Sequence, residues 1–244
     1  MLYTYKAYVN HIIISCLLDE VKMIVICGGI KGGGGKTTTA INLAIMRGLA
    51  GRDVLLVDSD SDDNANASDF SAIRDESFES KHYTTTKLSG KAIAKEIPVF
   101  AKKFQDIIID VGGQDSLSQR AALTIADVFV VPVFPSSFDT WVVESVNTLV
   151  EQVKSINTNL QAYCFLNRAD TSGTQNEETA QILREDYPEI TYIDCIIKNR
   201  KVFRNSASQG MGIVEYKPKD NKAIAEVAAL YKQVFGEAFK VDKK

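Results

Sequence analysis

Apolar stretches about as long as a β-strand alternate along the chain with longer amphipathic stretches of helical length. The candidate strands are Met23–Gly28, Asp53–Asp58, Asp106–Asp110, Val128–Val133, Gln161–Asn167 and Tyr192–Ile197. The candidate helices are Thr37–Ala50, Lys91–Lys102, Ser116–Ala126, Thr140–Ile156, Asn176–Asp186 and Lys222–Phe239. This alternation is typical of βα units that build a mostly parallel sheet. We therefore expect an α/β three-layer sandwich, with a twisted sheet flanked by helices on both faces.

The chain shows no internal repeat and no linker rich in Pro, Gly or Ser, so residues 23–244 are predicted to form a single domain. Residues 1–22 are interpreted as an N-terminal extension. Its apolar run His11–Leu18 is too short for a membrane span, and it lacks the basic start of a secretory signal. The extension is either an added strand or helix or the product of an upstream start codon, because Met23 directly precedes the first convincing strand.

Two segments modify the regular pattern. Ser61–Lys87 is polar and irregular, and we expect a mobile loop with room for one short strand. The candidate helix Lys222–Phe239 has apolar residues at steps of three and four, a stripe that suits either a membrane surface or the face of a sheet. Because Glu226, Glu237 and Asp242 lie nearby, docking on the sheet is favoured.

The composition is close to that of soluble globular proteins, with 45% hydrophobic and 24% charged residues, and it excludes collagen-like and disordered classes. The formal net charge of −3 argues against a surface that is basic throughout, so nucleic-acid binding would require a local patch. The four cysteines form no C-x-x-C pair, which indicates neither a zinc knuckle nor a disulfide framework. We expect reduced thiols in a cytosolic protein, buried at Cys27, Cys164 and Cys195.

Glycine is concentrated at one place, since six of the fifteen glycines lie between Gly28 and Gly35. This run follows a candidate strand and precedes a candidate helix. In that setting glycines let backbone N–H groups turn inward around phosphate oxygens, and the helix N-terminus adds partial positive charge. Lys36 can then reach the β- and γ-phosphates, and the Thr37 hydroxyl can bind Mg²⁺. The predicted phosphate-binding residues are Gly32, Gly33, Gly34, Gly35, Lys36, Thr37 and Thr38.

Acidic residues follow two of the predicted strands. Asp110 ends an apolar strand, where a carboxylate can hold Mg²⁺ through a water. Asp110 and Gly113 have the D-x-x-G spacing in which the glycine N–H senses a γ-phosphate. Asp58 and Asp60 lie two residues apart on one side of an extended segment. Near a magnesium–nucleotide site, one of them can support the metal shell while the other orients the attacking water.

The glycine loop departs from the common pattern, because Ile30 stands at its first glycine position and a second lysine, Lys31, follows. The run Lys31–Thr38 resembles the deviant Walker A loop of the ParA/MinD family of positioning ATPases. The resemblance covers most of residues 23–240 and is closest to the small plasmid-partition ParA type, since no helix-turn-helix domain precedes the loop. The further matching elements are Thr38–Ala44, Val57–Asp60, Ile107–Asp110, Ser116–Ser118 and Ala126–Val133.

The resemblance implies a single P-loop ATPase domain that binds ATP and Mg²⁺. It implies catalytic roles for Lys31, Lys36 and Asp60, and metal binding by Thr37, Asp58 and Asp110. In this family the lysine that corresponds to Lys31 crosses the interface of an ATP-bound homodimer and contacts the partner's nucleotide. The resemblance also implies that Asp60 orients the attacking water. After Asp60 the family usually has Pro-Gln, whereas this chain has Ser61-Asp62. The geometry of the following loop is therefore not implied by the resemblance.

The strand end Asn167-Arg168-Ala-Asp170 lies where bases bind at the edge of a parallel sheet. In the resembling family an Asn at this place contacts adenine, so Asn167, with Arg168 beside it, is predicted to bind the base. The N-x-x-D spacing also resembles the guanine-reading motif of GTPases, in which the Asp pairs with the base. ATP is favoured because of Lys31.

Residues 198–204 form a concentrated positive patch in an acidic protein. If a helix begins near Lys201, these cations lie at its N-terminal end, where the helix dipole disfavours them. Nucleic-acid phosphates would compensate, and the alternative is pairing with local acidic residues. The predicted DNA contacts are Lys198, Arg200, Lys201 and Arg204.

The favoured function is DNA partition by an ATPase whose ATP-bound dimer binds DNA non-specifically. Slow hydrolysis, stimulated by a ParB-like centromere-binding partner, would release it, and the protein would be cytoplasmic and associated with the nucleoid. A MinD-like membrane-associated positioning ATPase is the first alternative, although Phe239–Lys244 is a weak basic amphipath, so a membrane partner is not expected. A GTP-using switch, or a metabolic or redox relative of the same fold, is a further alternative.

Overall fold

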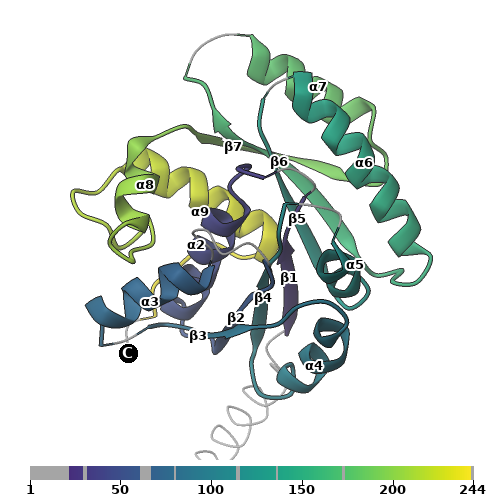
Figure 1. Cartoon of the computed structure of the whole chain (residues 1–244). Coiled ribbons are helices and arrows are strands. Elements are labelled where there is room, and N and C mark those ends of the chain that lie inside the picture. Colours follow the sequence, from purple (N-terminus) through teal and green to yellow (C-terminus); the bar gives the residue numbers. More distant parts are fainter. Residues whose placement is uncertain are drawn as a thin grey trace, which may run out of the picture.

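The computed structural model describes residues 22–29, 32–60, 67–79, 81–113, 116–135, 137–171 and 174–242. Within them, seven strands form one parallel sheet in the order β3-β2-β4-β1-β5-β6-β7 (Figure 1). The central strands are almost entirely buried, which explains their near-continuous apolar sequences. The strands are β1 (Met23–Cys27), β2 (Val54–Asp58), β3 (Thr84–Lys87), β4 (Asp106–Asp110), β5 (Val128–Val133), β6 (Gln161–Ala169) and β7 (Thr191–Lys198).

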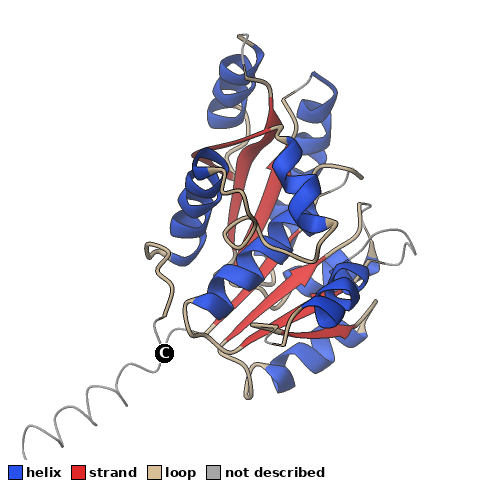
Figure 2. Cartoon of the chain, turned by 90° about the vertical axis from the view of Figure 1, so that its left-hand side faces the viewer, coloured by secondary structure: helices blue, strands red, loops and turns tan. Residues whose placement is uncertain are grey.

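Helices cover both faces of the sheet, so that the molecule has three layers (Figure 2). One face carries α2 (Lys36–Leu49), α3 (Ala67–Ser77), α8 (Lys201–Ala207) and α9 (Asn221–Phe235). The other face carries α4 (Ala92–Phe100), α5 (Leu117–Leu123), α6 (Ser137–Lys154) and α7 (Gln175–Glu185). The apolar sides of these helices and the two faces of the sheet form two separate hydrophobic cores.

The strand register brings several chemically active residues to one edge of the sheet. Cys27 of β1 and Asp58 of β2 both lie level with Asp110 of β4. Because the strands are parallel, the loops that follow β1, β2 and β4 leave the sheet at this same edge, where ligands bind in folds of this class. The fold therefore places the glycine loop beside the two acidic strand ends.

The predicted three-layer α/β sandwich is confirmed, and the six predicted strands end within two residues of their predicted ends. The predicted loop over Ser61–Lys87 is partly wrong, because α3 occupies Ala67–Ser77 and only β3 matches the predicted short strand. The sequence of α3 is weakly amphipathic, so its apolar pattern is faint. Tertiary contacts hold it instead: the fully buried Arg74 pairs with Glu215 and donates to Gly210 O.

The C-terminal helix α9 packs on the sheet, as predicted, through Ala223, Val227, Leu230, Tyr231 and Val234. Among the described residues, no helix has both the length and the apolar character that crossing a membrane requires. Cys27, Cys164 and Cys195 are buried free thiols, as predicted, and burial raises the pKa of each. The extension of residues 1–21, including Cys16, lies outside the described residues.

Candidate functional site

The predicted phosphate-binding loop connects β1 to α2. Gly35 is the N-cap of α2 with a φ of 92°, and a Cβ atom there would lie 2.2 Å from Asn167 Nδ2, so only glycine fits. Gly33 has a φ of 77°. The loop leads into the amino end of a helix, where unpaired N–H groups and the helix dipole favour anions. Ile30 and Lys31 lie outside the described residues, so the role of Lys31 stays a prediction.

Lys36, the first residue of α2, is a buried cation that is 7% exposed. Burial lowers the pKa of its amine, and the carboxylates of Asp110 and Asp60 act against that shift. Thr37 and Thr38 follow in the same turn and are half-buried. One cation and two hydroxyl side chains thus lie at the helix N-terminus, which is the set that binds a metal-bound polyphosphate.

Asp110 is fully buried at the end of β4. Burial raises the pKa of its carboxyl to about 7, the nearby Thr37 hydroxyl and Lys36 lower it, and Asp58 and Asp60 raise it. Within the described residues, neither carboxylate oxygen accepts a hydrogen bond of normal length and angle, and the Thr37 hydroxyl is the donor close enough to lower the pKa. A buried carboxylate in such surroundings is costly, and a cation beside it would relieve that cost.

These side chains fit a magnesium ion. Mg²⁺ prefers oxygen ligands and keeps part of its water shell, and Asp110 offers two buried oxygens next to the Thr37 hydroxyl. In the part of the chain that the structure describes, no group of three or more His, Cys, Asp or Glu side chains could hold a metal ion by itself. The remaining ligands would come from phosphate and water. Gly113, three residues after Asp110, is half-buried in the same segment.

The two aspartates after β2 have different surroundings. The buried Asp58 carboxylate accepts hydrogen bonds from the backbone N–H groups of Asp60 (3.2 Å) and Ser68 (3.0 Å), so it ties the start of α3 to the end of β2. Its predicted metal-side role stays a prediction. Asp60 is half-buried against the segment that follows Asp110, since a Cβ atom at Gly112 would lie 2.7 Å from Asp60 Oδ1.

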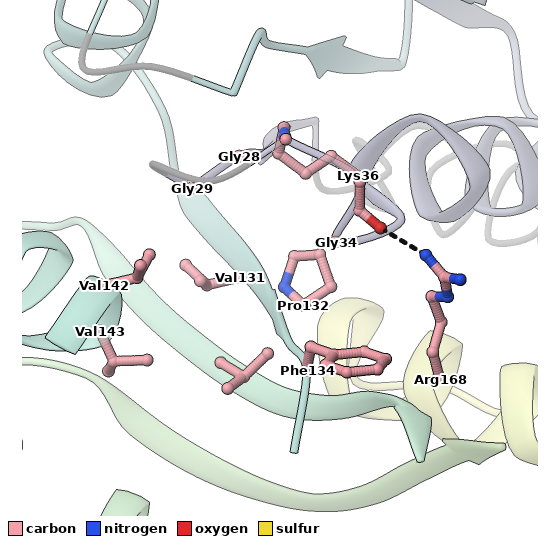
Figure 3. A pocket seen from close by; sticks show the side chains of 13 residues that line it. Gly28, Gly29, Gly34, Lys36, Val131, Pro132, Phe134, Val142, Val143 and Arg168 are labelled. Atoms are coloured by element: carbon pink, nitrogen blue, oxygen red, sulfur yellow. Dashed lines mark hydrogen bonds between the residues drawn. The ribbon is translucent and has the colours of Figure 1, made fainter. Parts of the chain in front are cut away.

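The end of β6 braces the glycine loop. Asn167 Nδ2 donates to Gly34 O (2.7 Å), and Arg168 Nη1 donates to Gly33 O (2.9 Å). Arg168 has a φ of 53°, which is uncommon for a residue other than glycine. Its guanidinium lies 5.6 Å from the centre of the Phe134 ring, on the wall of the cavity in Figure 3. Both predicted base-binding residues therefore lie beside the phosphate loop.

Two cavities meet at this loop. The first, of about 220 Å³, has the loop on one side and an apolar wall on the other, formed by Val131, Pro132, Val133, Phe134, Val142 and Val143 (Figure 3). The second, of about 620 Å³, lies between α2, the ends of β6 and β7, α8 and α9. Its volume is in the range of small-molecule sites. Its lining includes Gly33, Gly35, Thr38, Asn42, Asn167 and Arg168.

The residues of the predicted DNA patch differ in their pairing with acidic side chains. Arg200 is paired with Glu226 (2.7 Å) and lies 3.9 Å from Asp220, and its hydrogen bond to Glu226 raises its pKa. The alternative of pairing with local acidic residues therefore holds for Arg200. Helix α8 begins at Lys201, as predicted. All four predicted contacts line the second cavity, the paired Arg200 included: Lys198, Arg200, Lys201 and Arg204.

Sequence reasoning missed Gln119 in the first turn of α5. Its side chain is fully buried, and Gln119 Oε1 accepts a hydrogen bond from Gly29 N–H at 2.9 Å. The available signal was a glutamine on a helix whose neighbours Ala122 and Leu123 face the core. That signal is weak, because the contact joins residues 90 positions apart in the chain.

A parallel sheet with a glycine loop before α2, a buried lysine and an acidic strand end define a nucleotide-binding α/β protein. The chain belongs to the family described as the CobQ/CobB/MinD/ParA nucleotide binding domain, which matches residues 24–213. The resemblance to ParA/MinD proteins is thereby confirmed. The family is one of nucleotide-binding ATPase domains. No curated protein sequence matches the chain.

Solved structures share the fold at low sequence identity. A McdA variant from Cyanothece in complex with ATP has a TM-score of 0.75 and 15% identity, over 91% of this chain and 99% of that one. A plasmid partition protein from Borrelia burgdorferi has a TM-score of 0.58 and 17% identity, over 78% and 96%. MinD from Pyrococcus horikoshii with Mg-ADP has a TM-score of 0.65 and 22% identity, over 87% and 96%.

Proposed function

We propose that this protein is a positioning ATPase of the partition type, which binds ATP with Mg²⁺ and hydrolyses it slowly. The observation that carries the proposal is a buried Lys36 beside the fully buried Asp110, whose oxygens accept no hydrogen bond from the described residues. A magnesium–triphosphate suits both groups, because the phosphates meet the amine and the metal meets the carboxylate. McdA with ATP and MinD with Mg-ADP, which share the fold, support this assignment.

The second cavity is the proposed site of the adenosine. Asn167 and Thr38 line it next to the phosphate loop, in the position that the family resemblance assigns to the base. Asp170, which would read guanine in an N-x-x-D motif, is exposed and is not among the described residues that line the cavity. This arrangement favours ATP over GTP.

In the proposed reaction, Lys36 binds the β- and γ-phosphates, and Asp60 orients the attacking water. Thr37 and Asp110 would hold Mg²⁺, with Asp58 on the metal side. The bound metal would neutralise charge that develops on the phosphate oxygens. Asp60 packs against Gly112, next to Gly113, whose N–H is the proposed sensor of the γ-phosphate.

We infer that ATP binding produces a homodimer in which each Lys31 reaches the nucleotide of the other subunit. A cation in a water-poor interface stabilises phosphate charge strongly. The apolar wall of the first cavity supports such an interface, because it ends at Phe134, a large hydrophobic residue that is 37% exposed.

The proposed dimer binds DNA non-specifically through the cations at α8, and a ParB-like centromere-binding protein stimulates its release. Lys201 is exposed at the start of α8, and Arg204 is exposed one turn later. The protein would then lie on the nucleoid in the cytoplasm. A MinD-like membrane role is less favoured, because the apolar side of α9 is used for packing on the sheet.

The test is a nucleotide-state series on the wild type and the Asp60→Ala variant, with dimerisation and DNA retention measured on the same samples. We expect the wild type to dimerise and retain DNA with ATP but not with ADP, and Asp60→Ala to stay in the ATP-bound, DNA-bound state. Lys31→Ala should bind nucleotide without dimerising. The proposal is contradicted if the wild type binds no ATP, or if it retains DNA equally well with ATP and with ADP.

Liposome and DNA pelleting, each with and without ATP, separates the partition role from the membrane role. ATP-dependent pelleting with DNA alone supports partition. ATP-dependent pelleting with anionic liposomes alone supports the MinD-like alternative.

A further inference from the structure

The proposed function does not explain one contact between α5 and the phosphate loop. Gln119 Oε1 accepts the Gly29 N–H at 2.9 Å. At Gly28, a Cβ atom would lie 2.8 Å from Gln119 Oε1 and 2.7 Å from Val111 Cγ2, so the backbone is packed directly against both side chains. Gln119 therefore joins the start of the loop to α5, and Val111 packs against the same stretch of backbone.

A glutamine at this position has a cost. The side chain is fully buried, and Nε2 has no hydrogen-bond partner in the part of the chain that the structure describes. A buried donor without an acceptor is destabilising. A methionine of similar length would fill the space without the unpaired Nε2, but it would leave the Gly29 N–H without its acceptor. Packing alone therefore does not account for the amide, and the bond from Gly29 is the contribution that an apolar side chain could not make.

The Gly29 backbone lies close to the side chain of Lys36, which is proposed to reach the phosphates. A Cβ atom at Gly29 would be 4.0 Å from Lys36 Cδ, and the φ of 145° at Gly29 is open only to glycine. The turn of α5 that holds Gln119 is itself fixed, since Ser118 Oγ accepts the Gly90 N–H at 2.8 Å. Gln119 thus holds the Gly29 peptide, which lies close to the stem of Lys36.

We propose that Gln119 is a positioning residue for the terminal phosphate, which acts by fixing the Gly29 peptide and through it the Lys36 amine. This inference rests on the proposed ATPase function. Gln119 does not touch the reacting atoms. Because the lysine of such a loop reaches the β- and γ-phosphates, loss of the contact should weaken the preference for a triphosphate over a diphosphate more than it weakens nucleotide binding as a whole.

The experiment compares Gln119→Met with Gln105→Met in the full chain. Gln105 Oε1 also accepts a backbone N–H, that of Asp53 at 2.8 Å, at the other end of the sheet. The control therefore loses a bond between the same two groups, at an exposed place away from the site. Fluorescence titrations with ADP and with a non-hydrolysable ATP analogue, both with Mg²⁺, give the affinity ratio. Steady-state assays give kcat, and thermal unfolding gives Tm.

For Gln119→Met we expect the triphosphate-to-diphosphate affinity ratio to fall about fivefold or more and kcat to fall about tenfold. The affinity for ADP should stay within about threefold. Tm should change little, because loss of the unpaired Nε2 offsets the Gly29 N–H that is left without an acceptor. Gln105→Met should leave the ratio and kcat unchanged. The side chain of Gln119→Asn keeps an amide but is too short to reach Gly29, so its triphosphate-to-diphosphate affinity ratio should fall in the same way. This variant replaces Gln119→Met if the methionine variant does not fold.

An unchanged ratio in both Gln119 variants overturns the inference, and so does an equal loss of affinity for the two nucleotides, which would mark a merely structural role. A wild type that binds neither nucleotide is a different failure, because it contradicts the proposed function and not the path from Gln119 to Lys36.

Discussion

The two ends of β4 carry two fully buried aspartates in opposite surroundings, Asp106 and Asp110. Asp106 accepts Arg47 Nε at 2.7 Å and Arg52 Nε at 2.9 Å. Asp110 accepts no hydrogen bond from the described residues. At equal burial, Asp106 pairs with two guanidinium groups, whereas Asp110 forms no ion pair within the described residues and lies near the Thr37 hydroxyl and the Lys36 amine. The comparison separates a carboxylate that holds the fold together from one that is built for a ligand.

The pairing of Asp106 extends to the C-terminal helix. Arg47 also donates to Tyr231 Oη at 2.9 Å, contacts Glu237, and lies 4.3 Å from the centre of the Phe235 ring. This network joins α2, β4 and α9 at the amino edge of the sheet. Its groups satisfy one another, so it needs no ligand.

The largest change in the free energy of unfolding is expected from substitution of Asp106, at the start of β4. Asp106→Asn removes the negative charge that two guanidinium groups share, and it should lower the free energy of unfolding by about 3–5 kcal/mol. Urea unfolding measures this loss. Asp194, whose side chain is 81% exposed and lies 3.8 Å from Arg184, provides the control. Asp194→Asn should change the free energy of unfolding by less than about 0.5 kcal/mol. Equal effects of the two substitutions would remove the contrast.

Substitution of Asp110, at the carboxyl end of β4, should instead reduce activity and leave stability intact. Asp110→Asn should lower kcat for ATP about 100-fold or more, because the metal loses a charged oxygen ligand. The free energy of unfolding should stay the same or rise by about 1 kcal/mol, since the variant buries no charge. A colorimetric phosphate assay and urea unfolding measure the two quantities. A variant that loses stability as Asp106→Asn does would mark Asp110 as structural.

The pKa of Asp110 sharpens the comparison. Because this pKa is about 7 in the fold, above its ordinary value, the folded state binds more protons than the unfolded state between about pH 4 and pH 7. The free energy of unfolding should therefore fall as pH rises through this window, by at most about 1.4 kcal/mol per pH unit from this group. The measurement is the difference between wild type and Asp110→Asn at several pH values. A difference that does not vary with pH would contradict the raised pKa.

The smallest effect concerns the cations at α8, which show the same contrast. Arg200 is paired with Glu226, whereas Lys201 is exposed. Under the proposed DNA role, Lys201→Ala should remove about one phosphate contact. The slope of log affinity for DNA against log salt concentration should then become shallower by about one. Arg200→Ala should leave that dependence nearly unchanged. Filter binding over a range of salt concentrations distinguishes the two, and a larger change for Arg200→Ala would reverse the assignment.

Asp110 could be predicted from the sequence, because it directly follows a run of isoleucines. The isoleucines indicate a buried strand, and the aspartate marks the end of that strand. The glycine loop with Lys36 and Thr37 is equally local. The alternation of apolar and amphipathic stretches gave the layers of the fold for the same reason. These features are all contained in short windows of the chain.

Asp106 and Gln119 could not be predicted in the same way, because their meaning lies in partners that are distant along the chain. Arg47 and Arg52 meet Asp106 only when α2 crosses β4, and Gly29 meets Gln119 across 90 residues. Helix α3 was missed because the buried Arg74 replaces the apolar pattern that reports a helix.

The most direct test of the account is calorimetric titration of ATP into the wild type and Asp110→Asn, each with and without Mg²⁺. We predict that Mg²⁺ raises the ATP affinity of the wild type about tenfold or more and has little effect on the variant, because the phosphates meet Lys36 and the metal meets Asp110. No binding of ATP by the wild type, or the same gain from Mg²⁺ in both proteins, would contradict it.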